Sequence, residues 1–182
     1  MTVAEDVVRI GSAAAAFAQP GEELAGVLVT ETLGRRVYLC AFESARGRAW
    51  LALGADAEPL TDRRLVREAA SISALCEVAE ESAGGGHLTE LRARLAELHE
   101  TDNPEGIEEA EAAAASLAEL LESEPRVASS AYLDAIGSAS RRLEQALGDS
   151  GASPFAAAMQ SALGSVEELT EDVERNYKLP LE

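Results

Sequence analysis

Two kinds of hydrophobic pattern divide the chain. Residues 3–18 carry apolar side chains at alternating four- and three-residue steps, which predicts an amphipathic helix. Three short β-like segments follow at residues 24–31, 36–43 and 48–53. From about residue 61 onward the helical period returns and persists. The sequence therefore predicts one helix and three strands, followed by a long helical part.

Short turns separate the three strand segments. Leu33-Gly34 lies between the first two and Ala45-Arg46-Gly47 between the last two, and connections this short join antiparallel neighbours. Residues 37–42 of the middle segment show no polar alternation, which is typical of a central strand covered on both faces. We therefore expect an antiparallel meander. Its cover would be helices of this chain or of a second copy, or helices on one face and a partner on the other.

Five helices are expected after the meander. They cover residues 62–82, 88–98, 104–121, 129–147 and 154–177. Leu60 and Leu65 flank Thr61 as a hydrophobic staple flanks an N-cap residue. The last helix has the most regular apolar stripe and is expected to form the central packing surface of the C-terminal half. That stripe is Phe155, Met159, Ala162, Val166, Leu169 and Val173.

This order of elements predicts an α+β fold that is predominantly helical, with the five later helices forming an antiparallel bundle. We expect a single compact domain over residues 1–180. It would have an α/β lobe at 1–83 and a helical lobe at 87–180, separated by Gly84-Gly85-Gly86. Leu181-Glu182 match a dipeptide that cloning often leaves before a purification tag, so we leave them out of functional reasoning.

Composition and charge restrict the partners. The chain has 182 residues, of which 47% are hydrophobic and 26% charged, as in globular proteins. Fifteen Lys+Arg against 33 Asp+Glu give a net charge of −18, which repels nucleic acid and anionic lipid. The first residues are acidic rather than basic, unlike a secretory signal. We expect a cytoplasmic protein that binds neither nucleic acid nor membrane.

Few residues are arranged for chemistry. Cys40 and Cys76 lie in apolar surroundings and are interpreted as reduced core thiols. His87 is interpreted as a surface residue, and neither it nor His99 follows a glutamate by three positions as in di-iron bundles. The glycine triplet follows a helix and lacks the lysine of a phosphate loop. We therefore assign no catalytic residue, cofactor or metal.

One segment departs from the acidic background. Residues 35–67 hold seven of the fifteen cations and four acids, a net charge of +3. We call these cations the arginine patch: Arg35, Arg36, Arg46, Arg48, Arg63, Arg64 and Arg67. We favour the interpretation that they form salt bridges to the acidic helical lobe. The alternative is a site for an anion or an acidic partner, because guanidinium groups bind carboxylate and phosphate well.

Two classes of function follow from these patterns. The favoured one is a non-catalytic protein-protein interaction or scaffolding module that self-associates as a homodimer, motivated by strand faces and edges that need cover. The alternative is a protein or enzyme that binds a small anionic ligand between meander and helices through the arginine patch. An aromatic content of 4% argues against a large pocket for a stacked ligand.

Overall fold

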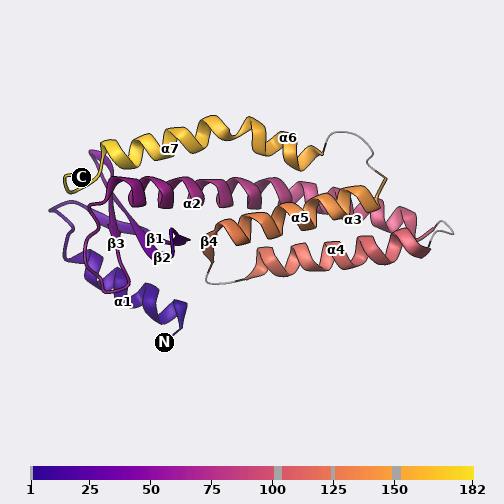
Figure 1. Cartoon of the computed structure of the whole chain (residues 1–182), viewed down its shortest axis with the longest axis horizontal. Coiled ribbons are helices and arrows are strands. Elements are labelled where there is room, and N and C mark those ends of the chain that lie inside the picture. The colour runs from indigo at the N-terminus through magenta and orange to yellow at the C-terminus, as the bar shows by residue number, and fades with distance from the viewer. Residues whose placement is uncertain (1, 101–103, 124–125, 149–152) are drawn as a thin grey trace. The chain divides into compact units, whose positions relative to one another are not determined.

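The computed structural model describes residues 2–100, 104–123, 126–148 and 153–182. The fold is α+β and mostly helical, as predicted, and Figure 1 traces the order of its elements. The chain divides into two compact units. The first, the sheet unit, comprises Met1–Ala74, Pro125–Ser130 and Gly164–Glu182. The second, the helical unit, comprises Leu75–Glu124 and Ala131–Leu163.

The sheet unit contains the predicted meander. Strands β1 (Glu23–Thr32), β2 (Arg35–Ser44) and β3 (Gly47–Leu53) pair antiparallel in sequence order. Leu33 and Gly34 have φ of 51° and 72°, the positive values that a tight two-residue hairpin turn requires. A fourth strand, β4, pairs parallel to β1 and gives the order β3-β2-β1-β4. β4 spans only Val127–Ser129, and the sequence analysis missed it.

Strand β2 is covered on both faces, as its continuous apolar sequence predicted. Val37, Leu39 and Ala41 belong to a core that includes residues of α2 (Arg63–Ala83) and α7 (Leu163–Arg175). The alternate residues belong to a second core with Ile10 and Ala14 of α1 (Val3–Ala15). Figure 1 shows α1 on one side of the strands, and α7 with the first part of α2 on the other. All of this cover comes from the chain itself.

The residues after α7 close the free edge of β3. The Trp50 amide donates to the Asn176 carbonyl at 3.0 Å, and the Lys178 amide donates to the Trp50 carbonyl at 2.9 Å. The Tyr177 hydroxyl accepts a hydrogen bond from the Ala52 amide at 3.0 Å and donates one to the Leu60 carbonyl. This segment therefore supplies the backbone partners that an edge strand otherwise lacks.

Leu181 and Glu182 are part of the packed structure. Leu181 packs against the core between the sheet and α2. The Glu182 amide donates to the Thr61 carbonyl at 2.8 Å, and its carbonyl accepts from the Arg63 amide at 3.1 Å. These two residues, set aside above, contact the start of α2 in the sheet unit.

Helix α2 begins one residue later than its sequence suggested. One carboxylate oxygen of Asp62 accepts hydrogen bonds from the amides of Arg64 at 3.0 Å and Leu65 at 3.4 Å. These are the second and third residues of the helix, whose amides an N-cap side chain satisfies. The cap is therefore Asp62, and the expectation of a cap at Thr61 was wrong.

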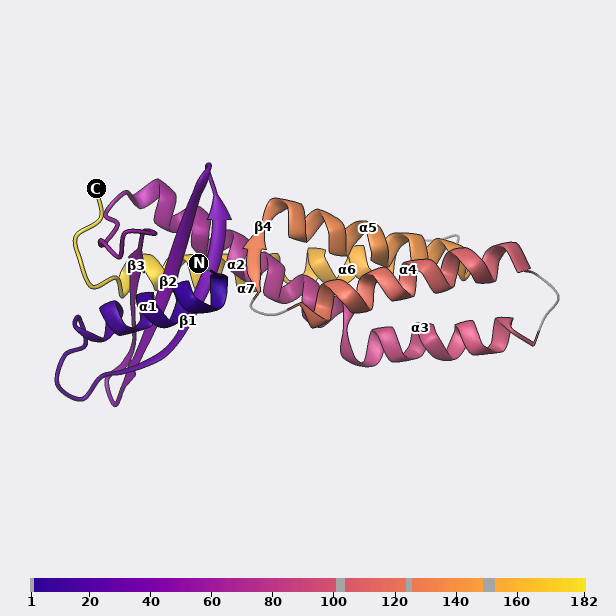
Figure 2. The same cartoon turned by 90° about the horizontal axis from the view of Figure 1, so that it is seen from below.

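Helices surround the core of the helical unit. They are the second part of α2, α3 (Gly85–Leu98), α4 (Pro104–Glu122), α5 (Ser130–Ala146) and α6 (Pro154–Ser161). Helices α3 and α4 run side by side, as Figure 2 shows. Alanines from α2 and α4 occupy much of the core, including Ala79, Ala110 and Ala113. In the described part of the chain, no helix is both long enough and apolar enough to cross a bilayer.

The last predicted helix is two helices. α6 ends at Ser161, Ala162 caps it with φ −91° and ψ −2°, and α7 begins at Leu163. The regular apolar stripe is divided as well, because Phe155 belongs to the core of the helical unit and Val173 to that of the sheet unit. The expectation of one continuous helix with one packing surface was therefore wrong.

The end of the chain does not follow the expected lobes. The sequence suggested that residues 87–180 belong to the helical lobe, whereas Gly164–Glu182 belong to the sheet unit. The cause is the pairing of residues 176–178 with β3 and the packing of α7 on the sheet. A single compact domain over residues 1–180 stays a prediction.

Candidate functional site

The structure places the arginine patch at three separate positions. They are the start of β2 for Arg35 and Arg36, the turn between β2 and β3 for Arg46 and Arg48, and the first turns of α2 for Arg63, Arg64 and Arg67. β2 has ten residues, so the first two positions lie about 30 Å apart along the strand. A high local density of arginine in the sequence therefore does not become one cluster in space.

Three of the seven arginines have a carboxylate partner among the described residues. Arg36 pairs with Glu31, Arg48 with Glu43, and Arg67 with Glu174 at 3.2 Å. The Glu31 carboxylate is the main cause of a raised pKa for Arg36. The first two pairs join neighbouring strands, and only Glu174 comes from the predicted helical lobe. Binding of an anion or acidic partner by the patch as a whole stays a prediction.

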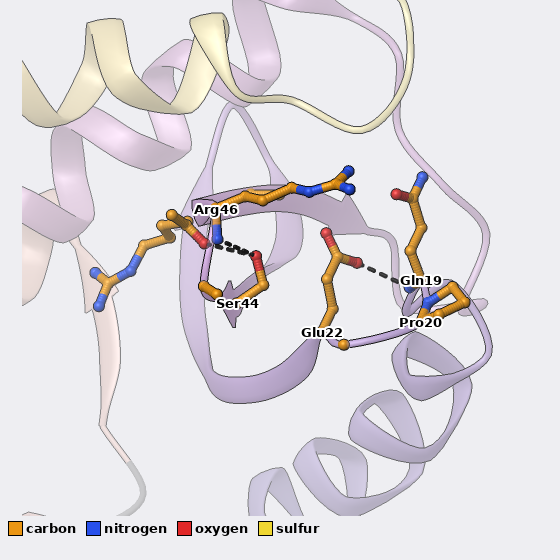
Figure 3. Close-up of a pocket in the computed structure, with 10 residues that line it drawn as sticks. Gln19, Pro20, Glu22, Ser44 and Arg46 are labelled. Atoms are coloured by element: carbon orange, nitrogen blue, oxygen red, sulfur yellow. Dashed lines mark hydrogen bonds between the residues drawn. The ribbon is translucent and has the colours of Figure 1, made fainter.

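Arg46 lines a pocket at one end of the sheet unit. The pocket has a volume of about 450 Å³ and lies between residues 19–22 and the turn at 44–49. In Figure 3 the Arg46 side chain extends toward Gln19 and Glu22. The Arg46 amide donates to the Ser44 hydroxyl at 3.1 Å, which holds the turn. Its guanidinium has no ion-pair or hydrogen-bond partner in the described part of the chain.

The carboxylate of this pocket is already engaged. Glu22 accepts a hydrogen bond from the Gln19 amide at 2.8 Å and forms an ion pair with Lys178. The Lys178 ammonium also lies 4.5 Å from the centre of the Phe42 ring. The Gln19 amide, and then Lys178, lower the pKa of Glu22. Glu22 is therefore charged at neutral pH, and Arg46 is the group of this pocket left to receive an anion.

Both cysteines are buried thiols, as predicted for core residues. Burial raises the pKa of Cys40 from 9.0 to about 12. It also raises the pKa of Tyr177 from 10.0 to about 12, against the opposing effect of the Ala52 backbone. Because the reactive form of cysteine is the thiolate, Cys40 is a poor nucleophile in the folded protein.

These two groups predict that the protein loses stability in alkali. Above pH 9.0 the unfolded chain releases protons that folded Cys40 and Tyr177 retain up to about 12. Their contribution is therefore complete below pH 9.0 and is lost at higher pH, by up to about 1.4 kcal/mol per pH unit for each group. Urea titrations at increasing pH should show the decline. Cys40→Ala and Tyr177→Phe should each make it less steep, and an unchanged slope in both would contradict the assignment.

A buried carboxylate in the helical unit escaped the sequence analysis. The Glu144 side chain is 2% exposed and accepts hydrogen bonds from the Ser153 hydroxyl and from the Phe155 amide at 3.0 Å. The His87 Nε2 lies 3.3 Å from the same carboxylate, so the interpretation of His87 as a plain surface residue was wrong. Glu144 thus holds the first turn of α6. The sequence signal for the burial of Glu144 was its position directly after Leu143, at the edge of the apolar stripe.

A groove lies between α5 and α6 in the helical unit. It has a volume of about 350 Å³, and we call it the α5–α6 groove. Its apolar lining is Leu133, Gly137, Phe155, Ala156, Met159 and Leu163, and its polar lining is Asp134, Arg141 and Gln160. A Cβ on Gly137 would meet the Phe155 ring at 3.5 Å and the Arg141 guanidinium at 3.2 Å. Because Gly137 has no Cβ, the Phe155 ring and the Arg141 guanidinium can both lie close to the α5 backbone.

Among the described residues, no group of three or more His, Cys, Asp or Glu side chains is placed to hold a metal ion. Comparisons of the chain with protein-family models, curated proteins and solved structures found no match. The function of the chain is therefore inferred from its own surfaces.

Proposed function

We propose that this chain is a non-catalytic protein-protein interaction module that self-associates as a homodimer. The observation that carries the proposal is the uncharged and largely exposed segment 153–163, most of whose apolar residues line the α5–α6 groove. No charged residue occurs in residues 153–163, in a chain of which 26% is charged. Ala156 and Ala157 are exposed, and Leu163 is 49% exposed. Apolar surface grouped in this way is typical of a contact site for another protein.

The sequence suggested self-association because strand faces and edges need cover, but the structure gives no such reason in the sheet. β2 is covered by helices of its own chain, and the β3 edge is paired with residues 176–178. A second copy is therefore not needed to complete the sheet unit. The support for self-association therefore comes from the α5–α6 groove of the helical unit.

Charge determines which partners fit. The sequence of the helical unit holds 17 Asp+Glu and four Lys+Arg, a net charge of −13. Such a surface repels nucleic acid, and it also repels a like surface wherever acids would meet. The uncharged residues 153–163 beside the groove form the part of this unit where that repulsion is weakest.

A second candidate function is the binding of a small anion beside Arg46. The unpaired guanidinium in a pocket of about 450 Å³ favours it. The Glu22 carboxylate lines the same pocket and opposes an anion there, so we rank this candidate second.

Sedimentation velocity at micromolar concentration tests the proposal. We expect a species of twice the 19.1 kDa chain mass, and a 19.1 kDa species across the micromolar range would overturn self-association. Thermal unfolding with phosphate or citrate, in wild type and Arg46→Ala, tests the second candidate. An anion that raises the Tm of wild type alone would favour anion binding instead.

A further inference from the structure

Two charged residues of α5 line the α5–α6 groove. Asp134 and Arg141 are seven residues apart on α5, so they lie on one helix face with their Cα atoms about 10 Å apart along the axis, and the Arg141 guanidinium reaches back over Gly137. Both are exposed. The Arg141 Nε donates to the Gly137 carbonyl at 3.2 Å, which holds the side chain over the groove. Neither residue has an ion-pair partner in the described part of the chain.

Most of the other residues that line the groove are apolar. Phe155 is 5% exposed and lies against Gly137 at the bottom of the groove. Met159 is partly exposed and Leu163 is half-exposed, so both present apolar atoms to an occupant. A partner must therefore offer an apolar centre, a cation for Asp134 and an anion for Arg141.

A second copy of this chain meets that description. When two identical helices pack antiparallel about a two-fold axis, the order of side chains along one is reversed on the other. Asp134 then faces the partner's Arg141 at one end, and Arg141 faces the partner's Asp134 at the other. A purely basic peptide would pair with Asp134 and leave Arg141 unmatched.

We propose that the α5–α6 groove is the self-association surface, with two α5 helices antiparallel and two reciprocal Asp134–Arg141 ion pairs. This inference rests on the proposed function. The uncharged α6 helices lie beside the pairs and bury Met159 and Leu163 across the two-fold axis. The rest of each helical unit, with its net charge of −13, keeps away from its counterpart.

Charge reversal tests this geometry directly. Asp134→Arg alone and Arg141→Asp alone each place like charges together at both ends of the interface. We expect each to weaken dimerisation about tenfold or more in sedimentation equilibrium. Mixing the two variants should restore association as a heterodimer, because every site then joins opposite charges. The double variant Asp134→Arg/Arg141→Asp should self-associate almost as well as wild type.

Matched controls separate the surface from the fold. Arg142→Asp makes the same charge change on the next residue of α5, outside the groove, and should leave the dissociation constant within about twofold of wild type. Leu163→Asp should weaken the dimer through the apolar centre without touching the ion pairs. Far-UV circular dichroism and thermal unfolding confirm that each variant is folded.

The outcomes distinguish the two proposals. A wild-type dimer that the groove variants leave intact, or that Arg142→Asp weakens equally, would overturn the assignment of this surface and leave self-association standing. Weakened single variants that fail to pair when mixed would overturn the antiparallel arrangement. A wild-type monomer would overturn the proposed function itself, and this inference with it.

Discussion

Replacing Leu39 by alanine is expected to lower the free energy of unfolding of the sheet unit by about 2–5 kcal/mol. Leu39 is completely buried at the centre of β2, in the core that the strands share with α2 and α7. Truncation would leave a cavity that these close-packed elements cannot fill. Trp50 is the chain's only tryptophan and lies in β3, so its fluorescence during urea titration reports on this unit.

The matched control is Leu28→Ala. Leu28 is the register partner of Leu39 on β1, but it is 39% exposed. The same substitution there removes less buried surface, so we expect a loss of about 1 kcal/mol or less. Equal losses at the two positions would mean that β2 is not the covered centre of the sheet.

Replacing Glu144 by alanine is expected to cost the helical unit about 3 kcal/mol. The substitution removes a buried carboxylate that accepts from the Phe155 amide and the Ser153 hydroxyl and lies beside His87, so these groups lose their partner in a buried place. Glu144→Gln keeps one acceptor oxygen, so its expected loss is smaller, about 1 kcal/mol. Far-UV circular dichroism during urea titration measures both variants, because the unit is helical.

Glu111 provides the control for this buried carboxylate. It is also a helical glutamate beside a histidine, with His99 at 2.7 Å, but its side chain is 53% exposed. Exposed ion pairs contribute little, so Glu111→Ala should cost less than about 1 kcal/mol. If Glu144→Ala were no more costly than Glu111→Ala, the Glu144 contacts would not hold α6 in place.

The sequence predicted the elements whose pattern is local. The strands of the meander, the turn at Leu33-Gly34 and the burial of residues 37–42 all follow from side-chain periodicity and turn chemistry, and the structure confirms them. Gly148 directly follows the helix predicted to end at residue 147, and its φ of 84° is the left-handed conformation typical of a glycine that ends a helix.

Features set by distant contacts could not be predicted in this way. β4 has only three residues, and its place is determined by pairing with β1, about a hundred positions earlier in the chain. Likewise, the break at Ala162 interrupts a perfectly regular stripe because its two ends belong to different cores. Periodicity shows which face of a helix is apolar, but it does not show how many cores that face serves.

The candidate site shows the same limit. The arginine patch was defined by density along the sequence, yet a ten-residue strand carries its two ends to opposite sides of the sheet unit. The α5–α6 groove joins residues from two helices, and Asp134 and Arg141 carry no motif. The Glu144 hydrogen bonds to the start of α6 and the close approach of Phe155 to Gly137 bring that surface together.

The division of the sheet unit along the chain has a consequence for its folding. The three strands of the meander are complete by residue 53, but α7 and the segment that pairs with β3 follow only after the 89 residues between Ala74 and Gly164. Those residues form the helical unit, except for Pro125–Ser130, which contain β4. On the ribosome the meander must therefore wait, with the part of one apolar face that α7 covers and the β3 edge both exposed, while the intervening helices are made. If the helical unit folds during this interval, the flexible chain between the meander and α7 becomes shorter. The entropy cost of bringing α7 back to the sheet is then lower.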